Sequence, residues 1–391
     1  MPVRESIVRK TLISVEENLQ VPEWSLSWKE LRLPGAGDAH WSIQKSILHG
    51  GKQEGVDLLV VDNGRLRISI IPTRGMNLWE ARCGDVRLGW DSPVKEVVHP
   101  GLVNLQARGG LGWLEGFGEW INRCGLESNG APGPDEVPNN TGKIVTTELT
   151  LHGRISYIPA REVVVTIDAA PPHRIRVRGV VDETMMFGPQ LRLTTEISTE
   201  PGSTSLTLDD EVKNVGGLPQ EMQTLYHCNF GPPILEDGAR LVAPAARVAP
   251  RDPRAAEDDG VAQYDRYGPP LPGYREQVYY LDLAANAKGE TEVLLKNRAG
   301  DRGASLRYPL KELPHFTVWK NTAGTPSGYV VGLEPATNFP NPRSVERKAG
   351  RVVLLKPGDT HHATLTVTAH LDAASVKASE ERIQALKAPA R

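Results

Sequence analysis

The chain has 391 residues, of which 39% are hydrophobic, so it is long enough to bury a sizeable core in one large domain or two smaller ones. Its formal net charge is −3, and acidic and basic residues are interspersed, which gives no basic face for nucleic acid and no acidic tail. The composition therefore favours a neutral or weakly charged small molecule as the partner.

The cysteines, Cys83, Cys124 and Cys228, are odd in number and form no Cys-x-x-Cys pair. They indicate neither a disulfide framework nor a zinc site, so free thiols in a reducing compartment are expected. The N-terminus carries charges where a signal peptide needs an apolar region, and no run of about 18 apolar residues occurs. We therefore predict a cytoplasmic protein with no membrane partner.

Residues 1–45 show little periodicity and are predicted to form an N-terminal extension with at most one helical piece, at 15–19. From about residue 46 the pattern changes to short runs of period-two alternation, separated by glycine, proline and asparagine. The runs 58–61 and 66–70 flank the pair Asn63-Gly64, which is typical of a β-hairpin.

Similar runs continue to residue 369 and predict a large antiparallel sandwich or barrel over 46–372. The runs are 161–167, 174–180, 191–197, 205–208, 277–281, 292–295, 304–308, 316–319, 352–355 and 363–369. Segment 244–272, rich in proline, arginine, aspartate and glycine, is interpreted as a long loop that is a candidate border of a site. Residues 373–391 are predicted to form a tail, helical over 373–386.

A short apolar strand is predicted at 329–333, bounded by Gly328 and Pro335, with Glu334 at its end. A carboxylate that closes an apolar strand costs several kcal/mol unless it is hydrogen-bonded or opens onto a cleft. Glu334 is therefore either a structural ion pair or a partly dry carboxylate that serves as a general base.

Four other islands combine turn glycines with polar groups. Arg74 follows the strand 66–71, and Arg123 precedes by about thirty residues a Leu-His-Gly sequence that contains His152. Arginine and histidine donate directional hydrogen bonds to sugar hydroxyls, although each is also common as a turn cap or a core residue. His227 leaves an apolar run just before a Gly-Pro-Pro turn. The fourth island joins Trp319-Lys320-Asn321 to Glu334 and Asn338.

The order of these motifs resembles the aldose 1-epimerase (galactose mutarotase-like) superfamily, and most closely its DUF4432 group. The motifs are Asn122-Arg123, Leu151-His152-Gly153, Tyr226-His227-Cys228-Asn229-Phe230-Gly231, Gly332-Leu333-Glu334-Pro335 and Lys356-Pro357-Gly358-Asp359. The resemblance covers roughly 47–370. It implies an all-β fold, a galactose mutarotase-like β-supersandwich with few short helices.

The resemblance also implies roles for individual residues. Glu334 matches the general base of the family and His227 its general acid. Arg123 and His152 match residues that position the sugar. Further substrate contacts are then expected from four other residues, namely Arg74, Lys320, Asn229 and Asn338.

Two departures from the family pattern concern the substrate. Arg154 stands where simple mutarotases have another glycine after the Leu-His-Gly, and no residue between His227 and Glu334 matches their substrate-binding aspartate.

The implied reaction is interconversion of sugar anomers, which needs no metal or redox cofactor. The same base and acid also suit a lyase or a ketose/aldose isomerase, where Arg74, Arg123 and Lys320 would neutralise an enolate or a uronate carboxylate. A third alternative is a carbohydrate-binding protein without turnover, because aromatic platforms such as Trp113, Trp120 or Trp319 suit any sugar site.

Overall fold

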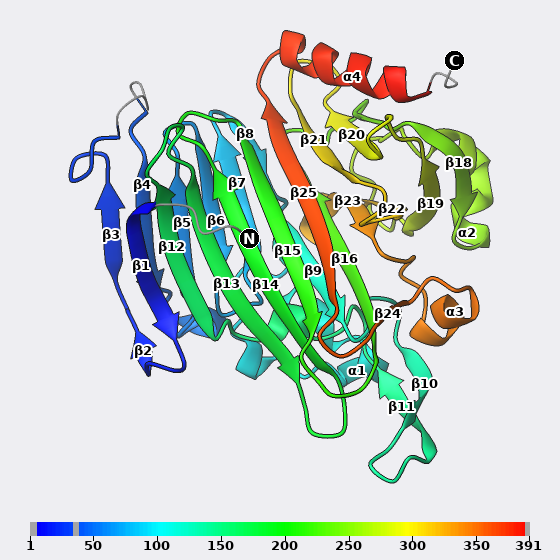
Figure 1. Cartoon of the computed structure of the whole chain (residues 1–391). Coiled ribbons are helices and arrows are strands. Elements are labelled where there is room, and N and C mark those ends of the chain that lie inside the picture. Colours follow the sequence, from blue (N-terminus) through cyan, green and yellow to red (C-terminus); the bar gives the residue numbers. More distant parts are fainter. Residues whose placement is uncertain (1–5, 34–38, 388–391) are drawn as a thin grey trace.

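The computed structural model describes residues 6–33 and 39–387, and within them the chain forms two large antiparallel sheets that face each other (Figure 1). The ten-stranded sheet runs, from edge to edge, β17 (Arg240–Val242), β20 (Glu290–Lys296), β21 (Gly303–Pro309), β25 (Thr360–His370), β15 (Ser205–Asn214), β14 (Gln190–Thr199), β13 (Ile175–Thr184), β12 (Glu162–Asp168), β1 (Ser6–Ser14) and β2 (Leu19–Gln20). The large antiparallel sandwich expected from the sequence is present.

The thirteen-stranded sheet carries the candidate site. Its main path is β18 (Ala245–Pro250), β19 (Gln277–Leu283), β22 (His315–Thr322), β23 (Tyr329–Ala336), β16 (Gln220–Phe230), β9 (Ile121–Leu126), β7 (Asn77–Cys83), β6 (Leu66–Ile71), β5 (Asp57–Asp62), β4 (Ser42–Ile47) and β3 (Trp24–Ser27). Beside this path, β24 (Val353–Leu355) pairs with β16, and β8 (Val86–Leu88) pairs with β7. A separate hairpin, β10 (Gly133–Pro138) and β11 (Ile144–Leu149), projects from the sandwich (Figure 1).

Period-two alternation explains both the core and the site. Side chains such as Leu208 and Leu365 of one sheet and Phe230 and Leu333 of the other belong to a single buried cluster between the sheets. Burying this apolar area is the main force that holds the sheets together. The alternate side chains of β16 and β23 lie on the outer face of the thirteen-stranded sheet, away from that core.

The prediction of an N-terminal extension is wrong for the described residues. β1 pairs with β12 in the ten-stranded sheet, and β3 pairs with β4 in the other, so the segment belongs to both layers of the sandwich. Residues 15–18 form a turn rather than a helical piece. β1 finds its partner β12 about 150 residues later, and β2 and β3 have only two and four residues, which leaves little local signal.

The segment 244–272 is more regular than expected, since it contains β18, the single-turn helix α2 (Pro253–Ala256) and a 3₁₀ turn at Glu257–Gln263. The remaining helices are α1 (Ala107–Gly110), α3 (Arg343–Lys348) and α4 (Ala373–Lys387). The helix expected at 373–386 is present as α4, which packs Val376 and Ile383 against Leu294 of β20. No helix in the described part of the chain has both the length and the apolar character to cross a membrane.

Candidate functional site

Two neighbouring strands place an imidazole and a carboxylate side by side. His227 of β16 and Glu334 of β23 both project from the outer face of the thirteen-stranded sheet, and His227 Nε2 lies 3.3 Å from Glu334 Oε1. Their side chains are only 5% and 2% exposed. Glu334 is not at a strand end as expected, because β23 continues through Pro335 to Ala336.

Gly332 leaves room for this pair. A Cβ at this position would lie 2.7 Å from Glu334 Oε1, 3.0 Å from His227 Cε1 and 3.1 Å from Trp319 Cε3. The side chains of His227 and Glu334 therefore meet directly above a strand residue that has no side chain.

Burial sets the protonation of the pair. It raises the pKa of Glu334 to about 8, with a further contribution from the negative charge of Glu276. Burial also lowers the pKa of His227 well below its usual value, and the neighbouring His152 acts in the same direction. At neutral pH the pair therefore holds one proton, as a protonated carboxyl beside a neutral imidazole.

Aromatic rings surround His227. Phe117 lies 5.1 Å from it, edge to face, and Trp319 lies 5.3 Å from it in a similar orientation. Trp113, from the 3₁₀ turn at Gly112–Gly116, packs at 4.7 Å on His152. These walls exclude water from the pair, which strengthens electrostatic interactions there.

His152 reaches the same site from a loop, with its ring 5.4 Å from that of His227. Its Nδ1 donates to the carbonyl oxygen of Asn129 at 2.9 Å, which leaves Nε2 as the free ring nitrogen. Burial lowers the pKa of His152 to about 4, so this imidazole is neutral. Asn338 forms a reciprocal amide pair with Asn129, at 2.8 and 2.9 Å.

Arg123 lies on the opposite face of the sheet from this site. β9 pairs it with Tyr226, whose side chain points into the core between the sheets, and not with His227. Its guanidinium donates to both carboxylate oxygens of Asp210, at 2.5 and 3.1 Å, and also to the Met76 carbonyl and the Thr195 hydroxyl. The sugar contact expected from the sequence is replaced by a buried ion pair.

Arg74 and Lys320 are also engaged inside the protein. Arg74 Nε lies 2.6 Å from Glu119 Oε1, and its guanidinium stacks on Tyr157 at 4.4 Å. Lys320 donates to the carbonyl oxygen of Gln263 at 3.2 Å, and burial lowers its pKa to about 8. Asn229 bonds to His227 rather than facing a ligand.

Glu276 and Arg251, two charged residues that act on Glu334, were not singled out in the sequence. Glu276 lies directly before β19. Its carboxylate accepts a hydrogen bond from Trp319 Nε1 at 2.7 Å and forms an ion pair with Arg251 at 3.0 Å. Both residues influence the pKa of Glu334. Their only sequence signal is their position in and beside the loop 244–272, since neither belongs to a motif.

Several buried polar atoms around the pair have no hydrogen-bond partner among the described residues. They include the indole nitrogen of Trp113, the amide nitrogen of Asn122 and the hydroxyl of Thr317. Asn122 is the register partner of His227, and Thr317 that of Glu334. An unsatisfied buried group costs about 1–3 kcal/mol, so a polar ligand here would gain from pairing with them.

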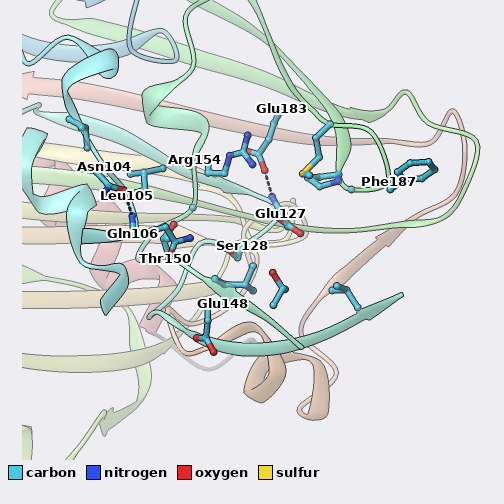
Figure 2. A pocket seen from close by; sticks show the side chains of 18 residues that line it. Asn104, Leu105, Gln106, Glu127, Ser128, Glu148, Thr150, Arg154, Glu183 and Phe187 are labelled. Carbon is cyan, nitrogen blue, oxygen red and sulfur yellow. Dashed lines mark hydrogen bonds between the residues drawn. The ribbon is translucent and has the colours of Figure 1, made fainter. Parts of the chain in front are cut away.

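A cavity of about 550 Å³ lies beside this site without including the His227–Glu334 pair (Figure 2). Thr150, Gly153 and Arg154, which flank His152 in sequence, line it. Glu183 also lines the cavity and accepts hydrogen bonds from the backbone nitrogens of Leu126 and Glu127 at 3.0 and 2.9 Å. The segment 150–154 thus has the side chain of His152 in the site and those of Thr150 and Arg154 in the cavity.

Solved structures share this architecture. A protein from Klebsiella pneumoniae subsp. pneumoniae, described as a "putative aldose 1-epimerase", is 38% identical, with a TM-score of 0.91 over 98% of this chain and 97% of that chain. A galactose mutarotase-like protein from Clostridium acetobutylicum is 14% identical, with a TM-score of 0.56 over 84% and 98% of the chains. A galactose 1-epimerase from Lactobacillus acidophilus is 12% identical, with a TM-score of 0.53 over 84% and 98%. The latter two show likeness of fold alone.

The sequence of residues 53–369 matches the model of the family described as "Domain of unknown function (DUF4432)". No curated protein matches the chain.

Proposed function

Because this chain belongs to the DUF4432 family, which shares the fold of galactose mutarotase-like proteins, we propose that it is an aldose 1-epimerase-like isomerase. The observation that carries the proposal is the 3.3 Å contact between His227 Nε2 and Glu334 Oε1 on one face of the sheet. A general acid and a general base at this separation can act on the ring oxygen and the anomeric hydroxyl of one sugar.

The proton count fits this reaction. Transfer of the shared proton from Glu334 to His227 gives a carboxylate and an imidazolium. Glu334 then removes the proton of the anomeric hydroxyl while His227 Nε2 protonates the ring oxygen, which opens the ring to an aldehyde. Rotation about the C1–C2 bond and reclosure invert the anomer, and the pair again holds one proton. Each transfer contributes about 10²–10⁴-fold in rate.

Two further side chains near the pair are available to bind the hydroxyl groups of the sugar. Neutral His152 presents Nε2 as a hydrogen-bond acceptor, and Glu276 presents a half-exposed carboxylate. Both suit the hydroxyls of a neutral sugar. The lyase alternative needs a free cation beside the pair. Arg74 and Arg123 are committed to buried carboxylates, Lys320 donates to the carbonyl oxygen of Gln263, and Arg251 pairs with Glu276.

Exchange of anomerically pure sugars, followed by NMR or polarimetry, tests the proposal. Glu334→Gln should lower turnover about 10³-fold or more and leave sugar affinity within about tenfold, because it removes proton transfer and keeps the shape. The matched control is Glu346→Gln, a buried carboxylate paired with Arg351, which should retain turnover.

Full turnover in Glu334→Gln would refute the epimerase proposal. Sugar binding by the wild-type chain without exchange of any anomer would instead support the carbohydrate-binding alternative.

A further inference from the structure

Asn229 follows His227 by two residues on β16, so both side chains lie on the same face of the strand. Asn229 is fully buried. Its Oδ1 lies 2.7 Å from His227 Nδ1, and its Nδ2 lies 3.0 Å from the carbonyl oxygens of both Glu119 and His227.

Chemistry determines which way this amide points. A backbone carbonyl oxygen can only accept a hydrogen bond, so the atom that faces the Glu119 and His227 carbonyls must be the amide nitrogen. The amide oxygen then faces His227 Nδ1 and can only accept. Nδ1 must therefore carry the hydrogen, and Nε2 is the nitrogen that gains and loses a proton beside Glu334.

We propose that Asn229 is a positioning residue that holds His227 in the Nδ1–H tautomer, so that Nε2 is the ring nitrogen that exchanges protons with Glu334 and with the substrate. The catalytic consequence rests on the function proposed above. This role replaces the substrate contact expected for Asn229 from the sequence.

The neutrality of the amide matters as much as its geometry. A carboxylate at this position would stabilise the imidazolium and weaken it as an acid. An amide accepts the same hydrogen bond without a charge, so the imidazolium gives its proton to a sugar oxygen more readily. The support is itself anchored, because the Glu119 carbonyl also accepts from Trp90 Nε1 at 3.2 Å and the Glu119 carboxylate pairs with Arg74.

The tautomer can be measured without any substrate. In the full chain labelled with ¹⁵N in its histidine rings, with His227 assigned by comparison with His227→Gln, Nδ1 should give a protonated, pyrrole-type signal and Nε2 a pyridine-type signal at neutral pH. The reverse assignment would overturn the proposal, whether or not the protein turns over a sugar.

Two variants test the consequence for the reaction. Asn229→Leu should populate both tautomers and lower kcat about 10–100-fold with little change in KM, because the substrate contacts remain. Asn229→Asp should shift the pH profile of kcat to higher pH, because its carboxylate raises the pKa of the imidazolium.

The matched control is Asn214→Leu. Asn214 is buried and donates to the carbonyls of Leu218 and Leu355 while it accepts from the backbone nitrogen of Gly216, but it lies at the end of β15. The Asn214→Leu variant should be less stable than the wild type but keep the Nδ1–H tautomer of His227 and the wild-type kcat. A normal tautomer with full kcat in Asn229→Leu, or an equal loss of kcat in the control, would refute the positioning role. If Asn229→Leu does not fold, the ¹⁵N spectrum of the wild type and the pH profile of Asn229→Asp still test the positioning role.

Discussion

The ion pair between Arg123 and Asp210 is enclosed between the two sheets, with both side chains at most 3% exposed. Arg123→Met should lower the free energy of unfolding by about 3–5 kcal/mol, because it leaves the Asp210 carboxylate buried without its partner. Urea unfolding measures this loss. Arg247→Met, which breaks an exposed pair with Asp282, is the control and should cost less than about 1 kcal/mol.

One outcome would contradict this structural role and favour the sugar contact that the sequence predicted for Arg123. That outcome is near-normal stability of Arg123→Met combined with a large loss of sugar affinity.

Glu276 acts on the pair through its charge. Its carboxylate helps to raise the pKa of Glu334, so Glu276→Gln should lower that pKa and move the alkaline limb of the activity profile to lower pH, by up to about one unit. The glutamine oxygen can still accept the hydrogen bond from Trp319. Because Glu276 is half-exposed, the shift should shrink as salt is added.

The control for this charge effect is Asp282→Asn, which removes another exposed acidic group of β19. It should leave the profile in place. An alkaline limb that does not move in Glu276→Gln would show that this charge does not reach the pair.

At the scale of the strand, Gly332 of β23 determines whether the pair can form. Gly332→Ala places a methyl group within 2.7 Å of Glu334 Oε1 and 3.0 Å of His227, so both side chains must move. Turnover should fall by about 10²-fold, since small misplacements are costly in proton transfer. The fold should remain, because the contacts are with side chains that can rotate.

Gly217→Ala is the control, because a Cβ there meets no atom within 4 Å. Circular dichroism and a sugar-exchange assay on both variants provide the measurement. Unchanged turnover in Gly332→Ala would mean that the pair does not need its present geometry.

The strands of the sandwich were predictable because alternation is a local property of an extended backbone. The hairpin of β5 and β6 carries its own turn signal at Asn63-Gly64. In contrast, β1 pairs with β12 about 150 residues later, and nothing within 1–45 encodes that partner. Long-range pairing is therefore where sequence reasoning failed.

The residues of the candidate site were also predictable where their signal is local and not where it depends on long-range strand pairing. Glu334 and His227 stand out because a charged or titratable group interrupts an apolar run. The face on which Arg123 lies depends on the register between β9 and β16, about 100 residues apart, and that register puts it opposite Tyr226. Glu276 lies near the pair only because β19, β22 and β23 are adjacent in the sheet.

For the whole molecule, the buried Glu334 links stability to pH. Burial raises its pKa to about 8 in the folded chain, above that of a carboxyl group exposed to water, so the folded state holds a proton that the unfolded state releases first. Wild-type stability should therefore fall as pH rises from about 5 to about 8. Glu334→Gln lacks this proton and should escape the loss.

The expected result is a stability difference in favour of Glu334→Gln that is near zero at about pH 5 and exceeds about 1 kcal/mol at about pH 9, since one pKa unit corresponds to about 1.4 kcal/mol. Urea unfolding of both proteins at the two pH values measures it. A difference that is constant with pH would contradict the raised pKa.

His227 and Glu334 are held by the ladder of paired strands, whereas Arg251 and Glu276 lie just outside β18 and β19. The segment between β18 and β19 can therefore change in sequence and length without changing the positions of His227 and Glu334. An insertion between 251 and 276 would present new groups to the substrate, while the spacing of acid and base stays fixed by strand register. If the proposed isomerase reaction is common to the family, exchanging this segment between two members should exchange their substrate preference and leave that reaction intact.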